Sequence, residues 1–320
     1  MTAAAFRSTN EAQPNNDSWQ GNRHLRERNV LRLLNRYEEV AHSEIKVSAE
    51  RWGLSVYPKV RLADVVPLGD LGIAEEDRSY GFKAHFDFVV CRNGWDPEYA
   101  IEFDGCYHST TVQMERDRKK NHLCAKCGLP LLRINSKYLS PTYGTLSLLA
   151  WLMDVYELKL GFEEQQACGA IPDDEPFDPF FFTSPEPGNI DRFPYWFAAR
   201  PRIRLRRLCE RGTILDPASS SLIGYDEKNV MRGMEYIRLT SSSGLYVRTA
   251  MRPQSFPLCF SDLLDEILSV QLAERVFGWL RREVREVPLR TIYSVADKMR
   301  ANLAIARSRI YGRSEGSRRP

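Results

Sequence analysis

The apolar residues of the N-terminal half are spaced as in helices that alternate with short strands. The predicted order is a helical segment at 22–52, strands at 55–62, 82–91 and 99–104, a helix at 112–126, a strand at 130–134 and a helix at 145–158. His42 and Ser43 are expected to divide the first segment into two helices, and 68–79 is predicted to be a turn-rich acidic loop. Asn93–Gly94 is a strong turn signal, so the strands beside it should form an antiparallel hairpin. We therefore predict an α/β fold, a mixed sheet flanked by helices.

The pattern changes beyond residue 160. Residues 161–200 are rich in proline and aromatic residues, which predicts a linker that packs on the core. Strands at 203–208, 236–240 and 245–249, a long amphipathic helix at 261–286 and a basic helix at 294–310 are expected to follow. The predicted organisation is a disordered tail at 1–20, an α/β domain at 21–160, the linker at 161–200, a basic α+β accessory domain at 201–312 and a loose tail at 313–320.

Composition narrows the class of protein. Apolar residues make up 43% of the chain and charged residues 27%, as in water-soluble globular proteins. No apolar run approaches the roughly 20 residues that cross a bilayer, and the first residues lack the apolar core of a signal peptide. Seven cysteines, an odd number, do not form a disulfide framework. We expect a cytoplasmic protein with no membrane contact.

Charge is unevenly distributed. The whole chain carries +3, but residues 201–320 hold 22 basic and 13 acidic side chains, a local excess of +9, and most of the basic residues are arginine. Arginine forks match phosphate geometry, so this region is compatible with nucleic acid. An ordinary solvated surface explains the same excess equally well.

Two predicted strands carry carboxylates within apolar stretches. Asp87 interrupts HFDFVV at 85–90, and Glu102 and Asp104 interrupt AIEFDG at 100–105. Because side chains alternate along a strand, Glu102 and Asp104 should point to the same face. Acids in apolar strands are costly unless compensated, and Mg²⁺ is held by a few carboxylate oxygens while it keeps positions for water and phosphate. The pattern predicts a site for Mg²⁺ or Mn²⁺.

The acids belong to a longer ordered set of motifs. DFVV and IEFDG are followed by His108, by Arg116 and Lys120 on the next helix, and by GLPLLRI at 128–134. This set resembles the restriction-endonuclease-like PD-(D/E)XK nucleases, more narrowly the very-short-patch-repair-like branch and similar uncharacterised bacterial domains. The resemblance covers about Ser43 to Ile134, somewhat under a third of the chain. It implies a restriction-endonuclease-like sheet and a Mg²⁺-dependent nuclease activity.

The resemblance also implies roles for single residues. Asp87 and Glu102 match the two motif acids that hold metal, and Glu44 matches a glutamate that often assists from the preceding helix. The family usually has a lysine two residues after the second acid, but here that residue is Asp104, which is a third candidate metal ligand. The lysine's role must then pass to another group. His108 is the first candidate because it is near in sequence and can act as a general acid or base, and Lys120 is another.

Basic residues elsewhere are candidates for contacts with nucleic acid. Arg116 and Lys119 would face phosphates if their helix borders the acids. In the predicted strand 203–208 and just before it, Arg202, Arg204 and Arg206 alternate on one face and would track a phosphate backbone. An exposed edge strand protected by charge is an equally good interpretation.

Cys124 and Cys127 form a single CxxC pair. One pair without a second is weak evidence for zinc, and packing on the inner face of a helix is the better interpretation.

These observations together predict a Mg²⁺-dependent endonuclease that cleaves DNA, in repair or in defence against foreign DNA, with RNA as the alternative substrate. Catalysis is assigned to Asp87, Glu102, Asp104, His108 and Lys120. The alternative is a nuclease-like module that binds DNA without cleaving it and acts with a partner, since the usual lysine is absent. Helix 261–286 is most simply part of the core or a surface for a homodimer or a partner protein.

Overall fold

The computed structural model describes residues 32–104, 111–143, 146–178, 198–252 and 254–311. Everything below concerns the unit Leu34–Pro320.

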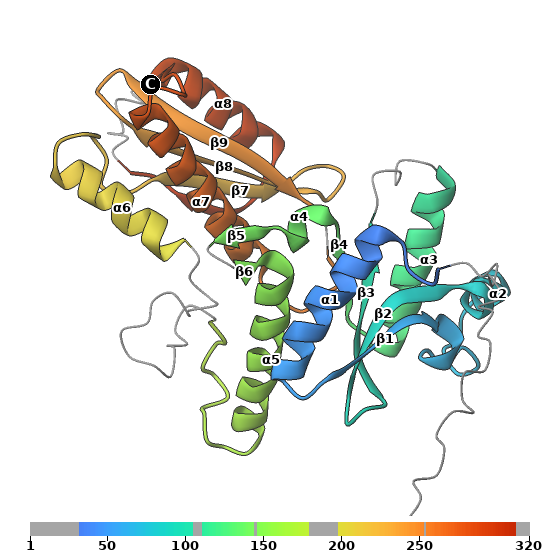
Figure 1. Cartoon of the computed structure of the whole chain (residues 1–320). Coiled ribbons are helices and arrows are strands. Elements are labelled where there is room, and N and C mark those ends of the chain that lie inside the picture. Colours follow the sequence, from blue (N-terminus) through green and yellow to red (C-terminus); the bar gives the residue numbers. More distant parts are fainter. Residues whose placement is uncertain (1–31, 105–110, 144–145, 179–197, 253, 312–320) are drawn as a thin grey trace, which may run out of the picture. The chain divides into compact units, whose positions relative to one another are not determined.

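The first sheet has four strands in the order β1-β2-β3-β4 (Figure 1). The elements that build it and surround it are α1 (Arg36–Arg51), β1 (Ser55–Arg61), a 3₁₀ turn (Leu62–Asp64), α2 (Glu75–Lys83), β2 (His85–Arg92), β3 (Asp96–Phe103), α3 (Thr111–Cys127), β4 (Leu131–Ile134), α4 (Ser136–Leu139), the short pair β5 (Pro141–Tyr143) and β6 (Leu146–Ser147), and α5 (Leu148–Ala167). Strands β1, β2 and β3 are antiparallel, and β4 joins β3 in parallel after the crossover through α3. The predicted mixed sheet flanked by helices is confirmed.

Helix α1 starts where a capping box fixes it. The Asn35 side chain accepts hydrogen bonds from the backbone amides of Tyr37 and Glu38, and the Glu38 carboxylate accepts one from the Asn35 amide in return. The helix then runs without a break through His42 and Ser43. The predicted division there is wrong, because buried residues at helical spacing, such as Ala41 and Ile45, continue across it.

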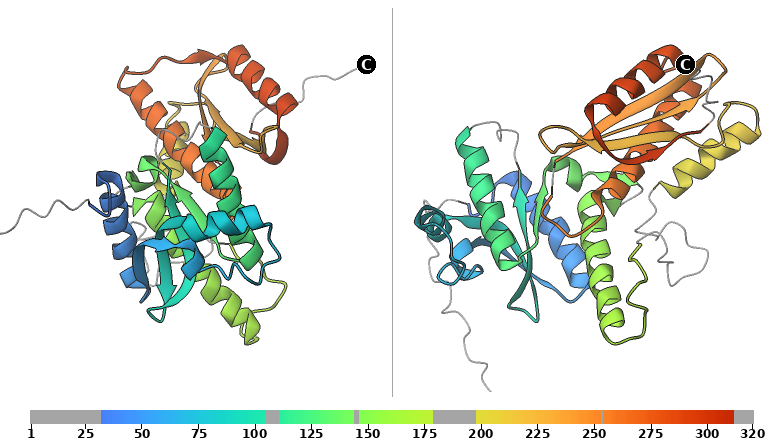
Figure 2. Two further views of the ribbon diagram at one scale, coloured as in Figure 1. Left: turned by 90° about the vertical axis from the view of Figure 1, so that its right-hand side faces the viewer. Right: turned by 180° about the vertical axis from the view of Figure 1, so that it is seen from behind.

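The second sheet has five strands in the order β10-β9-β8-β7-β11. Its elements are α6 (Ala199–Glu210), β7 (Ser220–Tyr225), β8 (Met231–Arg238), β9 (Ser243–Met251), α7 (Phe260–Leu280), β10 (Val287–Pro288), α8 (Leu289–Asn302) and β11 (Ala304–Arg309). Helix α7 packs along this sheet, and Figure 2 shows it from two further sides. The apolar face of α7, predicted as core or as a partner surface, is buried within the chain, as at Leu268 and Leu272.

Three further predictions of secondary structure are wrong. Residues 75–83 form α2 rather than part of a loop and strand, residues 203–208 lie within helix α6 rather than in a strand, and residues 304–309 form strand β11 rather than the end of a helix. The alternation of arginine with apolar residues imitated a strand, yet arginine and leucine are both good helix formers. Proline at 201 is tolerated because it stands in the first turn of α6. Strand β11 is an exposed edge strand and so lacks a burial pattern.

The two sheets share one hydrophobic core. Phe88 of the first sheet, Trp151 of α5 and Leu264 of α7 belong to the same buried cluster. Helix α5 extends to Ala167, beyond the predicted 158, and Phe177 packs on Phe162 with ring centroids 5.6 Å apart. The aromatic residues at 180–182 and 193–197 lie outside the described residues. Within the part that is described, no helix is long and apolar enough to cross a membrane.

Candidate functional site

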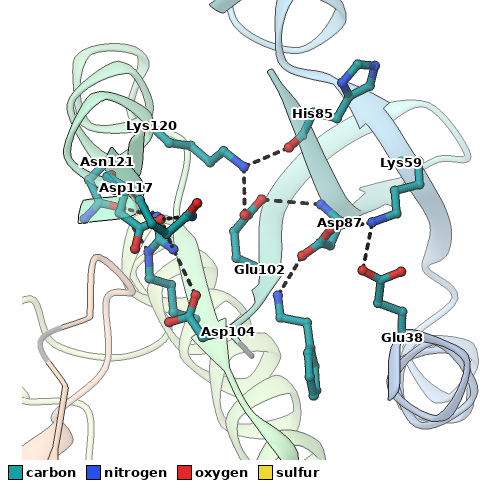
Figure 3. A network of polar contacts seen from close by, with 12 residues as sticks. Glu38, Lys59, His85, Asp87, Glu102, Asp104, Asp117, Lys120 and Asn121 are labelled. Carbon is teal, nitrogen blue, oxygen red and sulfur yellow. Dashed lines mark hydrogen bonds and ion pairs between the residues drawn. The ribbon is translucent and has the colours of Figure 1, made fainter. Parts of the chain in front are cut away.

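Asp87 and Glu102 meet on adjoining strands, β2 and β3 (Figure 3). The Asp87 backbone amide donates to Glu102 Oε1 at 3.3 Å, and the Phe103 amide donates to Asp87 Oδ2 at 2.9 Å. Each carboxylate is thus oriented by the backbone of the other strand. The structure brings these two predicted residues together.

Lys59 of β1 neutralises Asp87. Its Nζ lies 2.7 Å from Asp87 Oδ1 and 2.9 Å from Glu38 Oε1 of α1. Burial alone would lower the pKa of Lys59, but hydrogen bonds to Asp87 and Glu38 outweigh it and raise the pKa above its ordinary value of 10.5. Lys59 also has a φ of 54°, a left-handed conformation that is unfavourable for a lysine. Such backbone strain is concentrated at functional sites in proteins.

Lys120 of α3 neutralises Glu102. Its Nζ lies 2.7 Å from Glu102 Oε2 and donates to the His85 carbonyl oxygen, also at 2.7 Å. Both side chains are buried. Burial raises the pKa of Glu102 to about 6, Lys120 opposes this rise, and the charge of Asp87 adds to it. The pKa of Glu102 therefore lies above the ordinary value of 4.5 for a glutamate.

Asp104 belongs to a separate ion cluster. Arg133 of β4 donates from Nη1 to Asp104 Oδ1 at 3.1 Å and to Asp117 Oδ1 at 3.2 Å. Arg252 contacts Asp104 as well, and its Nη2 lies 3.2 Å from Asp117 Oδ2. Asn121 accepts two more hydrogen bonds from Arg133. The charges of Asp104 and Asp117 are thus compensated by Arg133 and Arg252, in a cluster separate from the Glu102–Lys120 ion pair.

Arg252 reaches this cluster because the segment after β9 docks on β4, the edge strand of the first sheet. Gln254 accepts a hydrogen bond from the Arg133 amide and donates one to the Arg133 carbonyl, both at 3.0 Å. The Leu131 amide donates to the Ser255 carbonyl at 3.0 Å. This segment covers a sheet edge that would otherwise be open. The C-terminal region therefore completes the cluster around Asp104.

The other predicted site residues lie elsewhere. His108 is outside the described residues. Glu44 is half-buried on α1, about 120° around the helix from Glu38, and makes no contact with the three acids among those the structure describes. Lys119 is buried and pairs with Glu76 of α2, whereas Arg116 is exposed on α3.

The three predicted arginines, Arg202, Arg204 and Arg206, do not all lie on one face, because their segment is helix α6, where residues two apart point in nearly opposite directions. Arg202 is turned inward, where it contacts Asp265 at 3.3 Å and also Glu266. Arg204 lies over the Phe277 ring at 5.8 Å. Arg206 is exposed and lies 3.4 Å from Glu210. The predicted stripe of alternating arginines along a strand is therefore wrong.

The donor set determines which metal the site suits. Within the described ranges, no group of three or more His, Cys, Asp or Glu side chains is placed to hold a metal ion. Asp87 and Glu102 nevertheless offer carboxylate oxygens from adjoining strands, and Mg²⁺ is often bound through one or two carboxylates with waters and substrate phosphates. Cys124 of the CxxC pair packs in the core, as the packing interpretation of this pair predicts.

Sequence reasoning missed Glu38, Lys59, Arg133 and Arg252. A signal existed for Arg133, which is a charge within the otherwise apolar PLLRI. For Lys59 the only signal in the sequence was the preceding Pro58, which indicates an irregular backbone. No signal in the sequence pointed to Arg252, because its role depends on a contact between distant segments.

Comparisons with known proteins add one match. A family described as a protein of unknown function (DUF2726) matches residues 30–143, which include α1, the four-stranded sheet and the candidate site. No curated protein and no solved structure matches the chain.

Proposed function

We propose that the first sheet and its helices form a restriction-endonuclease-like core that hydrolyses phosphodiester bonds of DNA with Mg²⁺ or Mn²⁺. Asp87 and Glu102 would hold the metal, and Lys120 would act beside it. The order helix, three antiparallel strands, crossover helix and parallel strand supports this proposal, together with the acids on the two central strands.

The observation that carries the proposal is the position of Lys120. Asp104 stands where the restriction-endonuclease-like nucleases usually have a lysine. Lys120 comes from the following helix and places Nζ 2.7 Å from Glu102 Oε2. A cation beside the second acid is thus supplied from a different element, so this departure from the motif does not remove the chemical group.

The residues have separate tasks in this reaction. Lys120 is held between Glu102 and the His85 carbonyl oxygen, where it would neutralise charge that develops on the phosphate. Lys59 keeps Asp87 oriented and compensates its charge in the free protein. When bound, Mg²⁺ supplies Lewis acidity and lowers the pKa of its water. Asp104 is a positioning residue in this scheme, because Arg133 and Arg252 engage it.

A second function is favoured by a specific observation. Lys59 and Lys120 each form an ion pair with one of the two acids. Such pairing suits a nuclease-like module that binds DNA but does not cleave it. This module would bind DNA without divalent cations, and its binding would weaken as salt is raised.

Nicking of supercoiled plasmid DNA tests the first function. The full-length protein should nick with Mg²⁺ or Mn²⁺ and not with EDTA, and Glu102→Gln and Lys120→Ala should each lower the rate by about 100-fold or more. Lys126→Ala is the matched control, because it removes an exposed lysine from the same helix, and it should keep the wild-type rate. Nicking that persists in Glu102→Gln would refute the proposed site. DNA binding by all variants without any nicking would establish the second function instead.

A further inference from the structure

A cavity of about 350 Å³ opens beside Asp104 and Arg133. Residues of β4 and α4 line one side of it, and residues of β9 and α7 line the other. We propose that this cavity binds one nucleotide, a base with its phosphate, from the DNA strand next to the bond that is cut. The inference rests on the proposed nuclease function and assigns the cavity to the substrate of that site.

The size and the walls of the cavity suit a base. Its volume is at the lower end of the range of about 300–1,000 Å³ for small-molecule sites. Leu264 and Ile267 of α7 form an apolar wall on one face of that helix. An apolar surface accepts the flat face of any base once that base leaves its stack. These dimensions and this wall favour one unstacked nucleotide over a duplex.

The cations at the cavity suit a phosphate. Arg252 and Lys137 both line it, and both side chains are exposed. Arg252 contacts Asp104 and Asp117, yet a guanidinium has five donor hydrogens in a fork that matches phosphate. Since Asp104 is two residues from Glu102, a phosphate at Arg252 would belong to a nucleotide adjacent to the candidate catalytic pair.

Polar groups at the cavity differ in what they can offer a base. The Gln254 side chain is already bound to both the amide and the carbonyl of Arg133. Gln271 makes no hydrogen bond to another described residue, and it lines the cavity from α7. An amide presents a donor and an acceptor together, which suits the edge of an adenine or a cytosine. Gln271 is therefore the residue that would distinguish between bases.

Equilibrium binding without metal tests the inference separately from cleavage. Each deoxynucleoside 5′-monophosphate, inorganic phosphate and a short single-stranded oligonucleotide would be titrated into the full-length protein in EDTA and followed by calorimetry. Ala250→Trp fills the cavity from an exposed strand position that lines it, and Arg248→Trp adds the same ring two residues away, outside the lining. Lys137→Ala removes an exposed cation.

The monophosphates should bind more tightly than inorganic phosphate, and Ala250→Trp should weaken both them and the oligonucleotide by about tenfold or more. Arg248→Trp should bind as the wild type does, and Lys137→Ala should weaken the monophosphates by about tenfold. Equal affinity of the wild type for inorganic phosphate and for the monophosphates would overturn the inference. It would also be overturned if Ala250→Trp weakened binding of the monophosphates but not of the oligonucleotide. Nucleotide binding without any nicking would uphold the cavity and refute the nuclease activity. Nicking without nucleotide binding would uphold the nuclease activity and refute the assignment of the cavity.

Discussion

Replacing Glu102 by glutamine should remove a pH dependence from the stability of the protein. The pKa of Glu102 is raised by burial from its ordinary value of 4.5 to about 6 in the folded protein. The folded state therefore holds this proton more tightly than the unfolded state does. Its contribution to stability is complete below pH 4.5 and is lost as the pH rises through 6. The difference between 4.5 and 6, at about 1.36 kcal/mol for each pH unit, is about 2 kcal/mol.

Urea denaturation at several pH values between about 4 and 7.5 measures this effect. The free energy of unfolding of the wild type, less that of Glu102→Gln, should fall by about 2 kcal/mol across this range, because other groups titrate in both proteins and cancel. Glu227→Gln, at an exposed turn position, is the control and should show no such change relative to the wild type. A difference that stays within about 0.5 kcal/mol, or one that rises with pH, would refute the reasoning.

Three further predictions concern the surroundings of the site. Lys59→Gly should be more stable in urea than Lys59→Ala by about 1 kcal/mol, because both lose the ion pairs but only glycine tolerates a φ of 54°; a more stable alanine variant would contradict this. Arg133→Met should cost about 3–5 kcal/mol and Arg252→Met about 1 kcal/mol or less, because their side chains are 5% and 42% exposed; equal losses in urea would show that exposure does not determine the cost. Burial raises the Cys124 pKa to about 12, so iodoacetamide at pH 8 should leave it unmodified in the native protein while exposed Cys168 reacts, as peptide mass spectrometry would show; rapid modification of Cys124 would contradict its burial.

Local pattern predicted the N-terminal half well. Alternation located Asp87 and Glu102 on neighbouring strands, and the Asn93–Gly94 turn fixed their antiparallel pairing. Helix α3 was predicted within a residue at each end, because Gly128 stops it. These features depend on residues close together in the sequence.

The local sequence pattern gave a wrong prediction where it is compatible with both a helix and a strand. Residues 202–206 alternate between arginine and apolar side chains, yet they lie in α6. The buried partners of Arg202, Asp265 and Glu266 on α7, are more than sixty positions away. A choice that depends on distant partners is invisible in a short window of sequence.

The sequence by itself determined the two acids, their strands and the helix that carries Lys120, because side-chain alternation and turn chemistry act over a few residues. Only the tertiary structure decided what surrounds those acids. Lys59 contacts Asp87 from a residue with left-handed backbone conformation. Lys120 contacts Glu102 from α3, the helix that connects β3 to β4. Arg252 contacts Asp104 although the two residues are 148 positions apart in the sequence. Buried carboxylates require compensating partners, and which partners they find depends on how the whole chain packs.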